Sequence, residues 1–399
     1  MYTLEKFEEA SEIVQNITSE TKLIYSRYFS EQTGNKVYFK PENMQNTGAY
    51  KVRGNYYKLS KMSAADKEKG VITASAGNHA LGIAYAAKKL SVDVTIVMPA
   101  TMPLSKVHKV ENYGANVILN GNCFEESYEY ASRLAKEKDM PFIHPFNDLE
   151  VSIGNGTIAM EIFKELPTVD YILVPAGGGG LLAGVATLVR MLNPKIKVIG
   201  VQPSGANCIQ ESLRRGEPVM LDRISTIADG VAVKAPGEAL FPYIKENVDD
   251  IITVEDHELI VAFVDLVENH RIIAENAGLL TIAALRHLDI KNKKVVSIIS
   301  GGNMDIITLS STVQHGLAMK DRVFTVSILL PDMPGELVKV ATIISELKGN
   351  VIELEHNQFV SVNRNDAVEL KITMEAYGTQ HKNKIFEELV KKGYRPKIV

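Results

Sequence analysis

Apolar runs of strand length alternate with segments of helical periodicity along most of the chain. The strand-like runs lie at residues 36–40, 70–74, 92–98, 116–119, 141–143, 170–175, 197–201 and 294–299. The helix-like segments lie at residues 4–14, 55–62, 79–90, 103–113, 124–138, 157–165, 181–192 and 257–268, with a predicted loop at 144–156. Repeated alternation of this kind predicts parallel sheets that helices cover on both faces.

The pattern changes near Asp321. A strand (323–330), a helix (336–347), two strands (350–356 and 367–373), a helix (380–392) and a closing strand (394–398) are predicted in that order. This βαββαβ order within fewer than ~100 residues is typical of a ferredoxin-like α+β domain. We therefore expect two domains, residues 1–319 and residues 320–399.

Composition narrows the class of function. Hydrophobic residues make up 45% and charged residues 23% of the 399 residues, which is typical of a globular chain with more than one core. The net charge of -4 favours a small-molecule partner over nucleic acid or an anionic membrane. The two cysteines, Cys123 and Cys208, and the lack of a signal-peptide pattern or a long apolar run predict a cytoplasmic protein.

Four adjacent glycines, Gly177, Gly178, Gly179 and Gly180, stand between a predicted strand and a helix that starts near Leu181. Backbone N–H groups at such a turn, together with the dipole of the helix, can hold a phosphate. Residues 178–183 also satisfy the G-x-G-x-x-G/A dinucleotide fingerprint. That alternative requires an acid at the end of the next strand, where the chain has Gln202, so it is disfavoured.

Two further loops follow predicted strands, where parallel sheets bind ligands. The loop from Ser75 to His79 offers a hydroxyl, an amide and backbone donors to a small carboxylate, and it is equally consistent with an ordinary helix cap. Ser300 places a neutral hydroxyl at the end of the run 294–299. Asp305 lies close by in sequence and is the alternative polar group at this position.

Lys51 follows Tyr50 and a Thr-Gly turn in the stretch Asn46–Gly54. Taken alone, it is most simply a solvated lysine in the first turn of a helix. A glycine loop, a carboxylate loop at Ser75 and a hydroxyl at Ser300 change this interpretation. Pyridoxal phosphate needs an amine for its aldehyde, a loop for its phosphate, a polar partner for its ring nitrogen and a site for the amino-acid carboxylate.

Eight motifs occur in one order: Glu42–Gln45 with the lysine stretch, Ala74–His79, His144–Phe146, Gly154–Ile158, the four glycines, Thr226–Lys234, Glu275–Gly278 and Ser300–Asn303. With them, residues 18–315 resemble the fold-type II pyridoxal-phosphate enzymes, most closely the threonine dehydratase (threonine ammonia-lyase) family. The resemblance implies an α/β catalytic domain at 1–319 with parallel-rich sheets. In it, a small lobe of roughly residues 52–150 is inserted in a large lobe.

The resemblance also implies the reaction and the site. The reaction is β-elimination of L-threonine, and of L-serine, to 2-oxobutanoate or pyruvate and ammonia. Lys51 is the Schiff-base lysine and the base, Asn78 contacts the cofactor's 3-hydroxyl and Ser300 faces its ring nitrogen. The full cofactor set is Lys51, Tyr50, Asn78, Gly177, Gly178, Gly179, Gly180, Leu181 and Ser300. The loop for the substrate carboxylate is Ser75, Ala76, Gly77, Asn78 and His79.

The chain departs from the family pattern at several positions. Ala49 stands where serine is frequent, Tyr50 where phenylalanine is common, and Leu81 and Asn155 where glutamine is usual, which leaves the substrate preference open. Ala76 occupies the position of the second base of the similar serine racemases, so little racemisation is expected.

Some relatives bind a divalent cation after the glycine loop through a glutamate, a carbonyl and an aspartate. The corresponding residues here are Gln202, Ala206 and Cys208. A neutral amide and a thiol replace the two carboxylates, so we expect no metal ion at this site.

The C-terminal segment resembles an ACT domain, an amino-acid-sensing module, through Asp332–Leu337 and the Gly349-Asn350 pair. Candidate effector residues are Pro334, Gly335 and Asn350, although the turn is equally consistent with no ligand. In an enzyme of isoleucine biosynthesis the effector would be isoleucine or valine. Because ACT domains commonly pair between subunits, a homodimer or homotetramer is expected.

Other functions remain as alternatives at this point. One is an oxidoreductase with a dinucleotide at residues 178–183, and another is a non-catalytic protein that binds amino acids for regulation. Within the resembled family, threonine synthase and cysteine synthase are weaker alternatives, because both need a second substrate.

Overall fold

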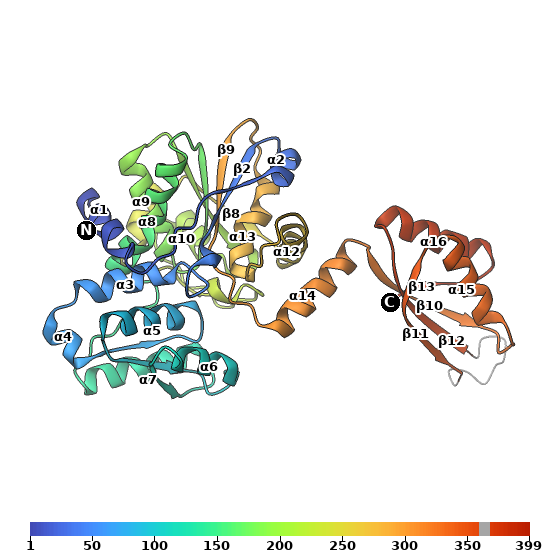
Figure 1. The fold of residues 1–399 in the computed structure, drawn as a ribbon, viewed down its shortest axis with the longest axis horizontal. Helices are drawn as coiled ribbons and strands as arrows, with labels where there is room; N and C mark the ends of the chain where they lie inside the picture. The colour runs from blue at the N-terminus through green and yellow to red at the C-terminus, as the bar shows by residue number, and fades with distance from the viewer. Residues whose placement is uncertain (359–367) are drawn as a thin grey trace. The chain divides into compact units, whose positions relative to one another are not determined.

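The computed structural model describes residues 1–358 and 368–399. The chain divides into two compact units, Met1–Met304 and Asp305–Val399, which are coloured along the chain in Figure 1. The predicted boundary lay after residue 319, so this division places helix α14 (Ile306–Met319) with the second unit.

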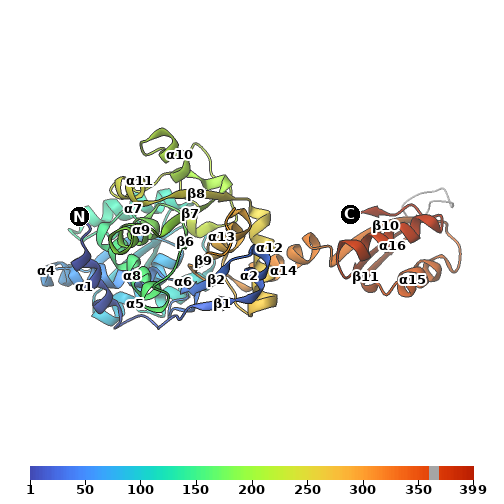
Figure 2. The same cartoon turned by 90° about the horizontal axis from the view of Figure 1, so that it is seen from above.

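The large sheet of the first unit has six strands. Their order is β1 (Ile24–Ser26), β2 (Lys36–Pro41), β9 (Lys294–Ile299), β6 (Tyr171–Pro175), β7 (Lys197–Pro203) and β8 (Asp250–Val254), and Figure 2 shows this succession from above. All neighbours are parallel except β1 and β2. The prediction of a parallel-rich sheet is confirmed, although the two edge strands, β1 and β8, were not predicted.

Helices cover both faces of this sheet (Figure 1). They are α1 (Leu4–Val14), α2 (Arg27–Thr33), α8 (Leu149–Glu165), α9 (Gly180–Leu192), α10 (Cys208–Arg215), α11 (Phe241–Asn247), α12 (Asp256–His270) and α13 (Asn276–Ala284). Short 3-10 turns are η1 (Glu42–Met44), η2 (Ser204–Ala206), η3 (Asp229–Val231) and η4 (Leu285–His287). Alternate strand residues such as Ile172 and Val174 pack into one core with α8 and α9.

The prediction of a loop at residues 144–156 is wrong over its second half, because α8 begins at Leu149. Asp148 caps this helix by accepting from the backbone N–H groups of Glu150 and Val151. Two glycines of this helix serve close helix packing. A Cβ at Gly154 would lie 2.8 Å from Gly54 Cα, and one at Gly156 would lie 2.8 Å from the Gly184 oxygen.

The small lobe has a parallel sheet of three strands, β3 (Val71–Ala74), β4 (Val94–Met98) and β5 (Asn116–Leu119). Its helices are α3 (Lys51–Lys61), α4 (Ala64–Lys69), α5 (Asn78–Leu90), α6 (Leu104–Glu111) and α7 (Phe124–Glu137). The predicted strand at 141–143 makes only a single bridge, between Phe142 and Ile72. The lobe has its own apolar core, which includes Ile83 and Ile96.

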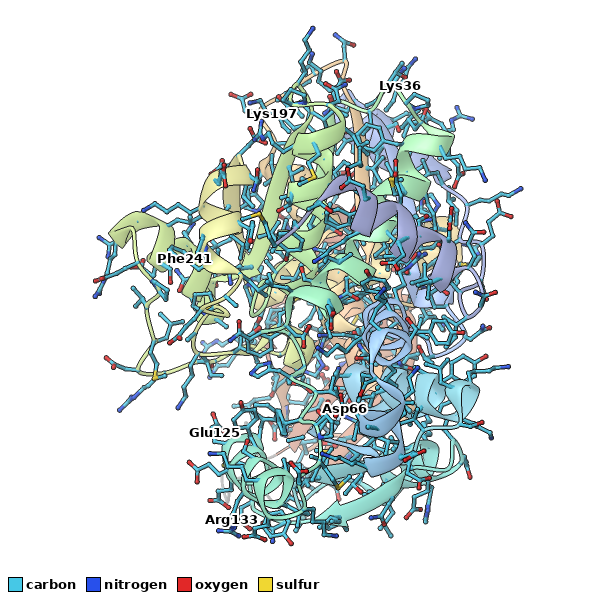
Figure 3. All side chains as sticks on the ribbon, turned by 90° about the vertical axis from the view of Figure 1, so that its left-hand side faces the viewer. Lys36, Asp66, Glu125, Arg133, Lys197 and Phe241 are labelled. Atoms are coloured by element: carbon cyan, nitrogen blue, oxygen red, sulfur yellow. The ribbon has the colours of Figure 1, made fainter. Side chains whose placement is uncertain are left out.

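Figure 3 shows how the two lobes face each other. Lys36 and Lys197, the first residues of β2 and β7, lie at the end of the large lobe that is remote from the small lobe. Glu125 and Arg133 of α7 lie at the opposite end of the picture. The carboxyl ends of the parallel strands therefore point toward the small lobe, where folds of this class bind ligands.

The second unit confirms the predicted βαββαβ order. Its elements after α14 are β10 (Val323–Leu330), α15 (Glu336–Glu346), β11 (Asn350–Asn357), β12 (Val368–Glu375), α16 (Thr379–Lys391) and β13 (Lys397–Ile398). The antiparallel sheet has the order β11-β12-β10-β13. The first residue of the predicted strand 367–373 lies outside the described residues, and the closing strand is shorter than predicted.

A buried ionic network fixes the first turn of α3. Arg53 and Glu42 are fully buried and pair through Nε and Oε2 at 2.7 Å. Arg53 also contacts Glu161 of α8 at 2.5 Å, and Lys40 of β2 contacts the same carboxylate at 2.5 Å. Burial alone raises the pKa of Glu42, but Arg53, together with Lys40 and Thr21, outweighs burial and the net shift is downward. The network joins β2, α3 and α8. Its central residue, Arg53, lies two residues after Lys51.

Replacing Arg53 by methionine is expected to destabilise the chain by about 3–5 kcal/mol, because it leaves the Glu42 carboxylate buried without its arginine. Urea denaturation followed by circular dichroism measures this change. Arg27→Met is the matched control, because the Arg27–Glu31 pair on α2 is exposed and contributes little. Equal stability of the two variants would contradict this account of the network.

Candidate active site

Lys51 is the first residue of α3, four positions before the helix start that the pattern predicted. The backbone N–H of Tyr50 donates to the Ser300 oxygen at 3.1 Å, and Ala49 makes a bridge to Gly301. The end of β9 therefore holds the lysine in place. Its Nζ lies 5.4 Å from the centre of the Tyr50 ring.

The surroundings of Lys51 make its amine unusually easy to deprotonate. Burial lowers the pKa of Lys51 to about 8, while the charge of Glu275 acts in the opposite direction. Burial, with the nearby Lys51 cation, lowers the pKa of His144 to about 4 and that of His79 well below its ordinary value. Both imidazoles are therefore neutral near pH 7, and Lys51 is the basic group of the site.

The glycine loop leads into the N-terminus of α9 at Gly180. Gly179 has φ +96°, a conformation that favours glycine, and a Cβ at Gly178 would lie 2.2 Å from the Phe146 ring. Among the described turn and side-chain hydrogen bonds, none uses the backbone N–H of Gly177, Gly178 or Gly179 as donor. Unpaired N–H groups at a helix N-terminus can bind a phosphate.

The segment His144–Phe146 connects the lysine with the glycine loop. Lys51 Nζ donates to the backbone oxygen of Pro145 at 2.7 Å, and the next residue, Phe146, packs against Gly178 and Gly180. His144 Nδ1 accepts from the backbone N–H groups of Phe146 and Asn147 at 3.2 and 2.9 Å, which shapes the turn. The structure thus brings together two stretches that are more than a hundred residues apart in the sequence.

The Ser75 loop joins β3 to α5, as predicted. Ser75 Oγ accepts from the Gly77 N–H at 3.3 Å, and Gly77 is exposed with no atom within 4 Å of an added Cβ. His79 differs from the rest of the loop. Its side chain is buried and its Nε2 lies 3.1 Å from Thr73 Oγ1, so its ring belongs to the small lobe's polar interior.

Ser300 is buried at the end of β9, whereas Asp305 serves another purpose. The Asp305 carboxylate accepts from the N–H and hydroxyl of Thr308 at 2.9 and 2.5 Å and so caps α14. The structure thus gives Asp305 a role as a helix cap, and Ser300 stays the predicted partner of the cofactor ring.

The structure also places two of the residues that depart from the family pattern, Asn155 and Leu81. Asn155 is buried in α8, and its Oδ1 accepts from the Gly54 N–H at 3.1 Å. Leu81 packs against the core of the small lobe. Both residues therefore contribute to packing around α3 and α5.

The three residues that correspond to the cation ligands of some relatives lie close together. Gln202 is buried, and its Nε2 lies 3.3 Å from the Ala206 oxygen and 3.8 Å from Cys208 Sγ. The Gln202 amide thus donates to the Ala206 carbonyl oxygen, which would have to coordinate a cation at this site. The lack of a metal ion stays a prediction.

Three groups at the site were not assigned a role from the sequence: the Pro145 carbonyl, Glu275 and Asn303. Asn78 Nδ2 donates to Glu275 Oε1 at 2.5 Å, and Asn303 Nδ2 donates to Asn78 Oδ1 at 2.8 Å. Glu275 and Asn303 belong to motifs that the sequence contains, but the pattern does not tell which residues they contact.

Comparison with known proteins identifies the family to which the chain belongs. The family described as pyridoxal-phosphate dependent enzymes matches residues 14–301. The chain belongs to this family, its cofactor is pyridoxal phosphate, and its first unit has the two-lobed fold-type II architecture. The dinucleotide alternative is therefore wrong.

Individual relatives show to which members of this family the chain is similar. The chain is 41% identical over 400 residues to an L-threonine ammonia-lyase of Thermotoga maritima, with all of both chains covered. A threonine deaminase isoform of Solanum lycopersicum is 35% identical with a TM-score of 0.75, covering 79% of this chain and 94% of that one. A serine racemase of Dictyostelium discoideum is also 35% identical, with a TM-score of 0.72 and coverage of 76% and 99%.

The residues present fit the cofactor. Gly177, Gly178 and Gly179 offer N–H groups that are unpaired among the described residues for its phosphate, Lys51 offers an amine of lowered pKa for its aldehyde, and Ser300 offers a neutral hydroxyl. When bound, pyridoxal phosphate takes up the electrons that are released when a bond at the Cα of an amino acid breaks.

The reactivity of Lys51 toward an amine-modifying reagent is expected to rise with pH around a midpoint near 8, because burial lowers its pKa. Modification of the cofactor-free chain at a series of pH values, followed by peptide mass spectrometry, measures this midpoint. Lys61, exposed on the same helix, is the internal control for the reactivity of the reagent. A midpoint for Lys51 at the ordinary pKa of a lysine, about 10.4, would contradict the assignment.

Proposed function

We propose that this enzyme is an L-threonine ammonia-lyase that converts L-threonine, and L-serine, to 2-oxobutanoate or pyruvate and ammonia. The observation that carries the proposal is the amine of Lys51, lowered in pKa and joined through Pro145 and Phe146 to the glycine loop. The Thermotoga maritima relative named L-threonine ammonia-lyase supports the choice of substrate, because its similarity extends over the whole chain.

In this proposal Lys51 would hold the cofactor through its aldehyde, and the free amine of Lys51 would remove the proton from Cα of the bound amino acid. The Ser75–Asn78 loop binds the substrate carboxylate through its hydroxyl and N–H groups. Ser300 is neutral, so it does not stabilise a positive charge on the ring nitrogen, which favours loss of the β-hydroxyl over transamination. Ala76 has no hydroxyl to act as a second base, which disfavours racemisation.

Lys51→Ala is expected to remove both the visible absorption band of bound cofactor, which borohydride bleaches in the parent chain, and at least about a thousandfold of the turnover. Both are measured on purified protein, with 2-oxobutanoate release from L-threonine as the assay. Lys61→Ala, on the exposed face of the same helix, should leave both unchanged. Normal 2-oxobutanoate production by Lys51→Ala would refute the role of Lys51. Release of the oxo acid from threonine alone would exclude a synthase, which needs a second substrate.

We further propose that the second unit is an ACT-like domain that binds an amino-acid effector. A hollow of about 270 Å³ supports this, since Pro334 and Gly335 line it together with Asp332 and His356. Asn350, the third candidate, is exposed at the start of β11 and contacts Glu375 instead. The hollow is of a size to hold a small amino acid.

Homo-oligomer formation and a cytoplasmic location belong to the same proposal. All eight residues of the edge strand β11 are exposed in the single chain, and such an edge favours pairing with another strand. Among the described residues, no helix is long and apolar enough to cross a membrane.

Gly335→Ala is expected to weaken any response of threonine turnover to isoleucine or valine at least about threefold while leaving turnover without effector unchanged. Gly335 has φ +93°, so a side chain strains the turn that lines the hollow. Gly378→Ala is the matched control, because Gly378 has φ +105° in the same unit and does not line the hollow. Turnover curves at several effector concentrations decide the matter, and an equal effect of both substitutions would count against this site.

A further inference from the structure

The side-chain amide of Asn78 is held from two sides. Its Nδ2 donates to Glu275 Oε1 at 2.5 Å, and its Oδ1 accepts from Asn303 Nδ2 at 2.8 Å. Asn303 Nδ2 also donates to the backbone oxygen of Thr47 at 2.8 Å. A relay of hydrogen bonds therefore runs from the stretch before Lys51, through the loop after β9 and the start of α5, to the residue before α13.

The donor and acceptor roles along this relay follow from its two ends, the Thr47 backbone oxygen and the Glu275 carboxylate. A backbone oxygen only accepts, so Asn303 must turn its Nδ2 toward Thr47. That Nδ2 then meets Asn78 Oδ1, which places Asn78 Nδ2 against Glu275, where a carboxylate oxygen accepts. Within residues 1–358 and 368–399, the second N–H of the Asn78 amide has no protein acceptor, so it can donate to a bound molecule.

Gly301 makes the contact between Glu275 and Asn78 possible. A Cβ at this position would lie 2.4 Å from Glu275 Oε1 and 3.0 Å from Asn78 Nδ2. The backbone N–H of Glu275 donates to the Gly301 oxygen at 3.0 Å. The carboxylate is thereby fixed beside the residue that follows Ser300, at the same end of β9 that holds Tyr50 and Lys51.

We propose that Glu275 and Asn303 are positioning residues, which fix the Asn78 amide so that its free N–H donates to the cofactor oxygen beside the bond to Lys51. In this proposal neither Glu275 nor Asn303 contacts the reacting atoms. The inference deepens the proposed function, because it rests on the placement of the cofactor at Lys51 and Asn78. It does not depend on which amino acid is the substrate.

The charge of Glu275 gives this arrangement a pH dependence. Burial raises the pKa of Glu275 to about 7, and donation from Asn78 opposes burial. Of the charged groups that face it, Asp229 raises this pKa further, while Lys106 and Lys51 lower it. Above this pH the carboxylate is a charged acceptor and holds Asn78 firmly. Below it, the neutral carboxyl group accepts more weakly.

The test measures the affinity of the cofactor-free chain for pyridoxal phosphate, followed by absorbance. Glu275→Gln keeps the size of the side chain but removes its charge, and Asn303→Ala removes the other contact of Asn78. Each should weaken binding about tenfold at pH about 8, as expected for loss of a charge-assisted or buried hydrogen bond. The deficit of Glu275→Gln should shrink at pH about 6, where the parent carboxyl group is also neutral.

The decisive comparison repeats both substitutions in an Asn78→Ala background. If they act through Asn78, each should then weaken the affinity by less than about twofold. A loss that is undiminished in that background would overturn the proposal, because the two residues would then act elsewhere. Glu211→Gln, on α10 beside Arg214, is the matched control for loss of a carboxylate and should bind like the parent chain.

Folding and substrate do not confound the result. Circular dichroism verifies each variant, and if Glu275→Gln does not fold, Asn303→Ala reaches Asn78 from the other side and decides alone. Cofactor affinity is read without threonine. A chain that binds the cofactor as expected but does not turn over threonine would refute the proposed activity and leave this inference standing.

Discussion

The backbone hydrogen bond between Tyr50 and Ser300 ties the start of α3 to the end of β9, and the active site depends on this junction. It places Lys51 where protein atoms displace water from the amine, which lowers the pKa of the lysine to about 8. An amine on a mobile surface loop would keep its ordinary pKa and remain protonated. The buried pair Arg53–Glu42 holds the same turn from its other side, so the position of the lysine is over-determined.

Glycines in this chain serve close approach more often than flexibility. Gly178 admits the Phe146 ring, Gly301 lets Glu275 reach Asn78, and the glycines of α8 let its backbone lie against neighbouring helices. Each of these contacts joins segments that are far apart in the sequence. In this chain the glycine motifs therefore serve tertiary packing as well as the proposed ligand binding.

The second unit has a separate apolar core, formed by β10 and β12 against α15 and α16, and includes Val326, Ile372 and Ile385. A unit with an apolar core of its own is able to fold without the core of another unit. A separate core of this kind is a physical condition for the regulatory role that we propose for the second unit.

The sequence by itself determined the alternation of strands and helices, the C-terminal βαββαβ unit, and the candidates Lys51, Gly177–Gly180 and Ser300. These follow from local periodicity and from residue types with restricted chemistry. Only the tertiary structure decided that residues 149–156 are helical, that Asp305 is a helix cap, and that Glu275 meets Asn78. Contacts between distant segments decide such features, because small and polar residues have the same local signature in a loop, a helix crossing and a binding site.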